Sequence, residues 1–141
     1  MSKKKIKGRG LTKGSVKAEC IVSKKAFGFW RSIDLENGTV IDKNSDIQGK
    51  NVKDKILVFP EGRGSTDGSI AFLEAVRKNC YPKGIINKES EPILVAGAVL
   101  AEKLYETTIP MMDRLEKDLY ETIQTGDVIE IDADKEEIII Y

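Results

Sequence analysis

A glycine-rich loop at residues 61–68 (Glu-Gly-Arg-Gly-Ser-Thr-Asp-Gly) holds the side chains whose types and spacing could do chemistry. The loop follows a continuous apolar strand predicted at residues 55–59 and precedes a predicted helix. The planar guanidinium of Arg63 can bind a carboxylate or a phosphate through two parallel hydrogen bonds. Gly64 lets the backbone approach a ligand closely. Ser65 stands between Arg63 and the helix start. The loop therefore predicts an anion-binding site.

Ser65 could act as a base in such a site. Positive potential from Arg63 and from the N-terminal end of a helix capped by Ser69 would lower the energy of a serine alkoxide. The chain has no histidine, which excludes Ser-His and Cys-His catalysis and HExxH zinc sites. Removal of a proton next to a carboxylate would then rely on electrostatic activation, assisted by another subunit. On spacing alone, a simple turn with Ser65 as a capping or solvated hydroxyl is the favoured interpretation.

A nucleotide-binding loop is the obvious alternative, and the spacing disfavours it. The glycines at 62, 64 and 68 give GxGxxxG, whereas the dinucleotide fingerprint is GxGxxG. A phosphate loop of the P-loop type ends in Gly-Lys-Ser/Thr, and here Ser69 and Ile70 follow the last glycine.

The elements that must position the loop have a mixed order. Apolar patterns and turn signals predict strands at 16–22, 39–41, 55–59 and 84–86, helices at 69–79 and 93–104, and a closing hairpin at 128–131 and 138–140. This order predicts one α/β domain over residues 1–141, with a barrel- or sandwich-like mixed sheet and flanking helices. Residues 1–14 are basic and glycine-rich and are expected to form a mobile or partner-docked arm.

Composition narrows the function classes further. Lys and Arg together number 23, as do Asp and Glu, so the zero net charge argues against nucleic-acid binding. No apolar run approaches the roughly 20 residues that span a bilayer, and the first ten residues lack a signal-peptide stretch, which predicts a cytoplasmic protein with no membrane contact. Cys20 and Cys80 are too few to hold an iron–sulfur cluster, so they are expected to be buried thiols and any cluster to belong to another chain.

Two segments together resemble the aconitase X swivel domain family. The Phe-Pro-x-Gly-Arg-Gly-Ser sequence at 59–65 and the Glu-Pro-Ile-Leu sequence at 91–94 are far rarer by chance as a pair than separately. Further matching pieces follow the family's order along nearly the whole chain, at residues 8–11, 14, 29–30, 33–34, 38, 41–42, 57–58, 68–69, 97–98, 109–110 and 125–127.

The resemblance implies a swivelling β/β/α domain that docks on a larger subunit and removes water from a hydroxy acid. It implies no cofactor on this chain and an iron–sulfur cluster, of the four-iron, four-sulfur type, on the large subunit as Lewis acid for the departing hydroxyl. The serine at the position of Ser65 is the proton acceptor in that family. Arg63, Gly64 and Arg9, which lies in a second Gly-Arg-Gly segment, are the expected substrate-binding residues.

For stand-alone archaeal members the resemblance implies a small anionic substrate, (R)-5-phosphomevalonate. Its dehydration would give trans-anhydromevalonate 5-phosphate for the archaeal mevalonate pathway to isoprenoids. Two alternatives stay open from the sequence: another aconitase X dehydration, for example of a hydroxyproline, and a docking or regulatory module without chemistry. The chain departs from the usual family pattern at 31–32, 43–46 and 111–114, where Met-Met-Asp-Arg replaces an apolar strand. The serine loop is spared.

Overall fold

The computed structural model describes residues 3–62 and 67–141 of the chain. Within these ranges the helices are α1 (Asp67–Arg77), α2 (Pro92–Tyr105) and the short α3 (Leu119–Thr122). The strands are β1 (Lys4–Lys7), β2 (Arg9–Gly10), β3 (Ser15–Val22), β4 (Ile56–Phe59), β5 (Gly84–Asn87), β6 (Met111–Asp113), β7 (Val128–Asp132) and β8 (Glu137–Ile140). The predicted strand–loop–helix unit and the closing hairpin are both present.

The described strands form one mixed sheet that curls back on itself. Its order is β1-β8-β7-β3-β4-β5-β6-β2, with parallel pairing from β3 to β6 and antiparallel pairing elsewhere. β1 and β2 stand at opposite ends of this order, yet only Gly8 separates them along the chain. The two ends of the sheet therefore lie side by side, as in a barrel. This confirms the predicted α/β fold with a mixed sheet and flanking helices.

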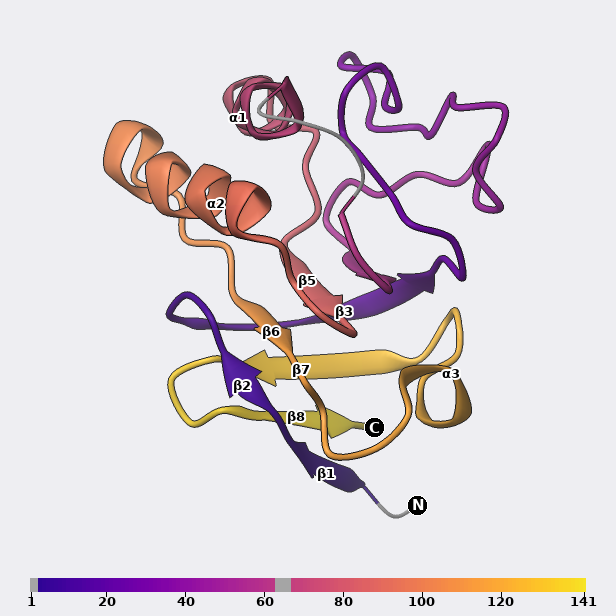
Figure 1. Cartoon of the computed structure of the whole chain (residues 1–141), viewed down its shortest axis with the longest axis vertical. Coiled ribbons are helices and arrows are strands. Elements are labelled where there is room, and N and C mark those ends of the chain that lie inside the picture. The colour runs from indigo at the N-terminus through magenta and orange to yellow at the C-terminus, as the bar shows by residue number, and fades with distance from the viewer. Residues whose placement is uncertain (1–2, 63–66) are drawn as a thin grey trace.

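The sheet separates two apolar cores, and β4 contributes to both. Ile56 and Val58 pack into the core enclosed by the curled sheet, with side chains of β1, β5, β7 and β8. Leu57 and Phe59 point the opposite way, into the core beneath α1 and α2. All four β4 side chains are fully buried, which explains why this strand reads as a continuous apolar run rather than an alternating one. Figure 1 shows α1 and α2 together, on the side of the molecule away from β1 and β8.

Four phenylalanines pack together into a wall that lies beside Gly62 and Gly68. Phe27 contacts Phe29 edge-on with ring centroids 5.2 Å apart, and it also lies 5.7 Å from the ring of Phe59. Phe29 in turn meets Phe72 of α1 edge-on at 4.9 Å. All four are buried, whereas Trp30 is half exposed in the turn at residues 30–32.

The N-terminal segment differs most from the sequence prediction. Residues 4–7 and 9–10 are strands of the sheet rather than a mobile arm, and Ile6 is 1% exposed in the enclosed core. β1 pairs with β8 and β2 with β6, so partners more than 100 residues away fix this segment. With a single buried apolar residue among lysines, the sequence of β1 lacks the alternation of apolar and polar residues from which a strand is predicted.

Two smaller expectations also fail. Residues 39–41 make isolated bridges, Ile33 with Val40 and Thr39 with Asn51, instead of a strand, because turns around Gly38 (φ +85°) fold the segment back on itself. Ser69 is not the N-cap of α1, since that helix already includes Asp67. Ser69 still lies in the first turn. In the described parts of the chain, no helix is long and apolar enough to cross a membrane.

Both cysteines are buried free thiols, as expected. Cys20 donates from Sγ to the carbonyl oxygen of Gln124 (3.0 Å), and burial, reinforced by the negative charge of Asp127, raises the pKa of its thiol from 9.0 to about 11. In the unfolded chain the thiol would ionise near its ordinary pKa.

This difference predicts a pH-dependent stability. Between about pH 9 and pH 11 the unfolded chain loses the Cys20 proton while the folded chain keeps it, so the free energy of unfolding falls as pH rises through this window. Below pH 9 the contribution is fully present. Urea unfolding at pH 7.5 and pH 10.5 should show a larger drop for the wild type than for Cys20→Ala. Equal drops in the two proteins would contradict the assignment.

Candidate active site

The loop predicted to do chemistry is described only at its flanks. Arg63, Gly64 and Ser65 lie outside the described residues, so their roles stay predictions. On the N-terminal flank, Gly62 forms a parallel bridge with Phe27, whose backbone N–H donates to the carbonyl oxygen of Glu61 (3.1 Å). On the C-terminal flank the chain enters α1 at Asp67.

The two flanks meet at one small hollow. Its lining comes from the phenylalanine wall, both flanks of the loop and the start of α2, namely Phe27, Gly28, Phe29, Gly62, Gly68, Ser69, Glu91 and Leu94. The hollow measures about 10 Å³, room for roughly one water molecule. The N-terminal ends of both long helices border it, and each carries partial positive charge from the helix dipole.

Glu91 ties the loop to α2. It is the N-cap of that helix, and its Oε1 accepts from the backbone N–H of Leu94 (3.0 Å). A Cβ placed on Gly62 would stand 2.8 Å from Cγ of Glu91, so glycine is needed there for the close approach. The Gly and Glu of the two motifs that carry the family resemblance are thus in contact.

Removal of this cap should destabilise the protein. Glu91→Ala leaves the Leu94 N–H without its acceptor and should lower the free energy of unfolding by about 1 kcal/mol. Glu91→Ser, which restores a capping oxygen, should recover most of the loss, as measured by urea unfolding of the isolated chain. An alanine variant as stable as wild type would show that the cap contributes nothing.

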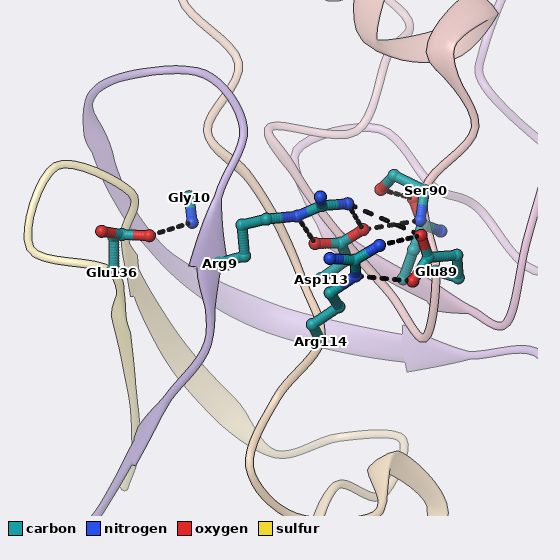
Figure 2. Close-up of polar contacts among 8 residues, drawn as sticks. Arg9, Gly10, Glu89, Ser90, Asp113, Arg114 and Glu136 are labelled. Atoms are coloured by element: carbon teal, nitrogen blue, oxygen red, sulfur yellow. Dashed lines mark hydrogen bonds and ion pairs between the residues drawn. The ribbon is translucent and has the colours of Figure 1, made fainter.

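Arg9 belongs to a polar network with Asp113, Glu89 and Arg114 (Figure 2). Its Nε and Nη2 donate to the two carboxylate oxygens of Asp113 at 2.8 and 2.7 Å, and this hydrogen bonding raises the pKa of Arg9. Nη2 also lies 3.7 Å from Oε2 of Glu89. Glu89 accepts from Nε and Nη2 of Arg114, both at 2.9 Å, which lowers the pKa of Glu89.

The backbone on both sides of Arg9 is fixed as well. Gly8 N–H donates to the backbone carbonyl of Glu136 (3.1 Å), and Gly10 N–H donates to its carboxylate (3.0 Å). A Cβ on Gly10 would overlap the carbonyl oxygen of Ala133. The glycines of this Gly-Arg-Gly segment therefore permit close packing, which holds Arg9 in one place.

Sequence reasoning missed Asp113. It appeared only as a departure from the family pattern, but its carboxylate is fully buried and accepts from Arg9 and from the backbone N–H of Ser90 (2.8 Å). An acidic residue ending a buried Met-Met strand, with an isolated arginine elsewhere in the chain, is the signal that could have suggested an ion pair.

A metal ion or cluster needs several ligating side chains close together. The described residues contain no group of three or more acidic or cysteine side chains placed to hold a metal. Cys20 is buried in the core enclosed by the curled sheet, and Cys80 is buried just after the end of α1. Burial raises the pKa of both thiols. A thiol held in its protonated form is a poor ligand for iron.

Comparisons with known proteins agree with this architecture. The chain is 44% identical over 128 residues to the phosphomevalonate dehydratase small subunit of Methanocaldococcus jannaschii, covering 91% of each chain. It is 40% identical over 134 residues to the protein of that name from Thermococcus sibiricus, covering 95% of this chain and 96% of the other.

Solved structures agree as well. The fold matches the crystal structure of Thermococcus kodakaraensis aconitase X in its holo-form with a TM-score of 0.87 and 38% identity, covering 98% of both chains. A solution NMR structure of a UPF0107 protein matches with a TM-score of 0.83 and 35% identity, over 98% of this chain and 99% of the other. The family model described as the aconitase X swivel domain matches residues 5–140. The chain therefore belongs to the aconitase X swivel domain family.

Proposed function

We propose that this chain is the small subunit of a phosphomevalonate dehydratase, a cytoplasmic hydro-lyase that is active only together with its large subunit. The observation that carries the proposal is the match over more than nine-tenths of the chain to relatives named as that subunit in M. jannaschii and T. sibiricus. The uninterrupted Phe-Pro-x-Gly-Arg-Gly-Ser sequence at residues 59–65 supports it.

Ser65 is the proton acceptor in this proposal. The substrate, (R)-5-phosphomevalonate, loses a proton to Ser65 from the carbon next to its carboxylate, and the freed electron pair forms the double bond as the hydroxyl on the neighbouring carbon leaves as hydroxide. The proton taken up by Ser65 then joins this hydroxide to complete the water that is eliminated. The product is trans-anhydromevalonate 5-phosphate. Arg63, Gly64 and the first turn of α1 supply positive potential that stabilises a deprotonated Ser65, and Arg63 and Arg9 bind the substrate's anionic groups.

The remaining chemistry belongs to the partner. A four-iron, four-sulfur cluster on the large subunit, when bound, supplies the Lewis acid for the departing hydroxyl. The hollow beside Gly62 has room for about one water molecule, so a substrate of this size needs walls contributed by the large subunit.

The decisive experiment is reconstitution. The chain would be expressed alone and together with the cluster-bearing large subunit from the same genome, and each preparation assayed for dehydration of (R)-5-phosphomevalonate. We expect activity only from the complex. A complex that dehydrates hydroxyproline but not phosphomevalonate would replace the substrate assignment, and a stable complex that turns over neither would favour a docking module.

A further inference from the structure

Asp113 is a fully buried carboxylate to which the proposed reaction assigns no role. It accepts three hydrogen bonds, from Nε and Nη2 of Arg9 and from the backbone N–H of Ser90, all between 2.7 and 2.8 Å. A buried carboxylate is costly unless charged or polar donors satisfy it, and these three donors do so. The carboxylate therefore joins β2, β6 and the turn before α2 at a single point.

That point is connected to the N-terminal flank of the serine loop. Ser90 precedes Glu91, whose side chain lies against Gly62, as described above. The same turn is bound to the end of β4, because the backbone N–H groups of Lys88 and Glu89 donate to the carbonyl oxygen of Pro60 at 3.0 and 3.1 Å. Displacement of this turn would therefore displace residues 60–62, which lead into the loop.

A second chain of hydrogen bonds stiffens the connection. The Ser90 hydroxyl donates to the side-chain oxygen of Asn87 (2.7 Å), and the Asn87 amide donates to the carbonyl oxygen of Phe59 (3.0 Å). Asn87 is fully buried, like Asp113. Satisfied buried polar networks of this kind hold a unique arrangement, because each unmade bond carries a large penalty.

The pairing also orients Arg9. Both oxygens of Asp113 face the Nε–Nη2 edge of the planar guanidinium, which fixes the plane and directs Nη1 away from that carboxylate. The Arg9 side chain is 39% exposed, whereas its partner is fully buried. An arginine whose guanidinium is fixed by a buried carboxylate on one edge and is partly exposed elsewhere is preorganised to bind an anion.

We infer that Asp113 is a positioning residue of the active site, which fixes the guanidinium of Arg9 and holds the turn at residues 88–91 against residues 60–62, the segment that leads into Ser65. The inference rests on the proposed function, since it assigns Arg9 and Ser65 to the reaction.

The test is a double-mutant cycle in the assembled two-subunit enzyme. Asp113→Asn keeps the size of the side chain but places an amide N–H group against one of the three donors. We expect kcat/KM per assembled complex to fall about 10- to 100-fold, the loss that a misplacement of about 1 Å can cause. Arg9→Ala should cause a similar loss. Because Asp113 acts through Arg9, the double variant should be little worse than Arg9→Ala alone.

Glu74→Gln is the matched control, since it neutralises a carboxylate in an exposed ion pair with Arg77 on α1. It should leave kcat/KM unchanged. Wild-type kinetics for Asp113→Asn, or losses that multiply in the double variant, would overturn the inference.

A second readout separates this inference from the proposed function. Amide hydrogen exchange of the isolated chain needs no turnover. Asp113→Asn should speed exchange at Ser90, in the first turn of α2 and at residues 59–62, while Glu74→Gln should not. Unchanged protection at Ser90 would overturn the positioning role even in an active enzyme. A wild-type complex without dehydratase activity, together with lost protection in Asp113→Asn, would instead reject the proposed function.

Discussion

Replacement of Ser65 by alanine should reduce turnover of (R)-5-phosphomevalonate by about 100- to 10,000-fold in the two-subunit enzyme. General base catalysis contributes factors of about this size, and with no histidine in the chain the proposal offers no other base on this subunit. The loss should appear in kcat more than in KM, because the proposed function has Ser65 take the proton while Arg63 and Arg9 bind the anion. Steady-state kinetics of purified complexes measures both constants.

The assembly must be unaffected for this result to bear on chemistry. Size-exclusion chromatography and the visible absorbance of the cluster should match the wild type, since alanine removes one oxygen and adds nothing. Ser15→Ala is the matched control, because Ser15 is an exposed serine at the start of β3. It should retain full activity. A Ser65→Ala complex with near-normal turnover would show that the proton goes elsewhere, and the role of the loop would be reduced to binding.

The second large effect is expected at Phe72, on stability rather than chemistry. Phe72 is fully buried between Phe29 and α2, where it lies close to Gly97. Phe72→Ala should lower the free energy of unfolding by about 3–5 kcal/mol through lost burial and the cavity left behind. This is a large share of the roughly 5–15 kcal/mol that stabilises a typical domain. Urea unfolding at 25 °C measures it.

Ile70 provides the control on the same helix. Its side chain is 60% exposed, so Ile70→Ala should change stability by no more than about 0.5 kcal/mol. The comparison removes helix propensity from the argument, because alanine is introduced into α1 in both variants. A Phe72→Ala loss below about 1 kcal/mol would mean that the space beneath α1 and α2 can collapse around the smaller side chain.

Local patterns in the sequence were sufficient to predict many of the helices and strands. The apolar run of β4, the helical spacing that became α1 and the Glu-Pro start of α2 each depend on neighbouring residues, so their predictions were confirmed within two residues. β1 could not be predicted in this way. Its only buried side chain is Ile6, and its existence depends on pairing with β8 at the other end of the chain.

The residues of the candidate site likewise differ in whether neighbours in the sequence reveal them. The loop could be singled out because Arg63, Gly64 and Ser65 are adjacent, whereas the partner of Arg9 is 104 positions away. An isolated Asp113 has no sequence neighbour that reveals its purpose. Only the fold brings it to Arg9 and to the backbone of Ser90, and a buried ion pair of this kind stays hidden until the strands are placed.

The position of β1 and β2 at opposite ends of the strand order has a consequence for biosynthesis. Lys4 lies opposite Ile140 in the sheet, so β1 has no edge to join until residues 137–140 have been synthesised. The ion pair between β2 and β6 likewise waits for residue 113. Contacts across such long stretches of chain form slowly, because closing a large loop costs entropy before any pairing is gained. During translation, Ile6 remains in solvent while its lysine neighbours keep the nascent segment from aggregating.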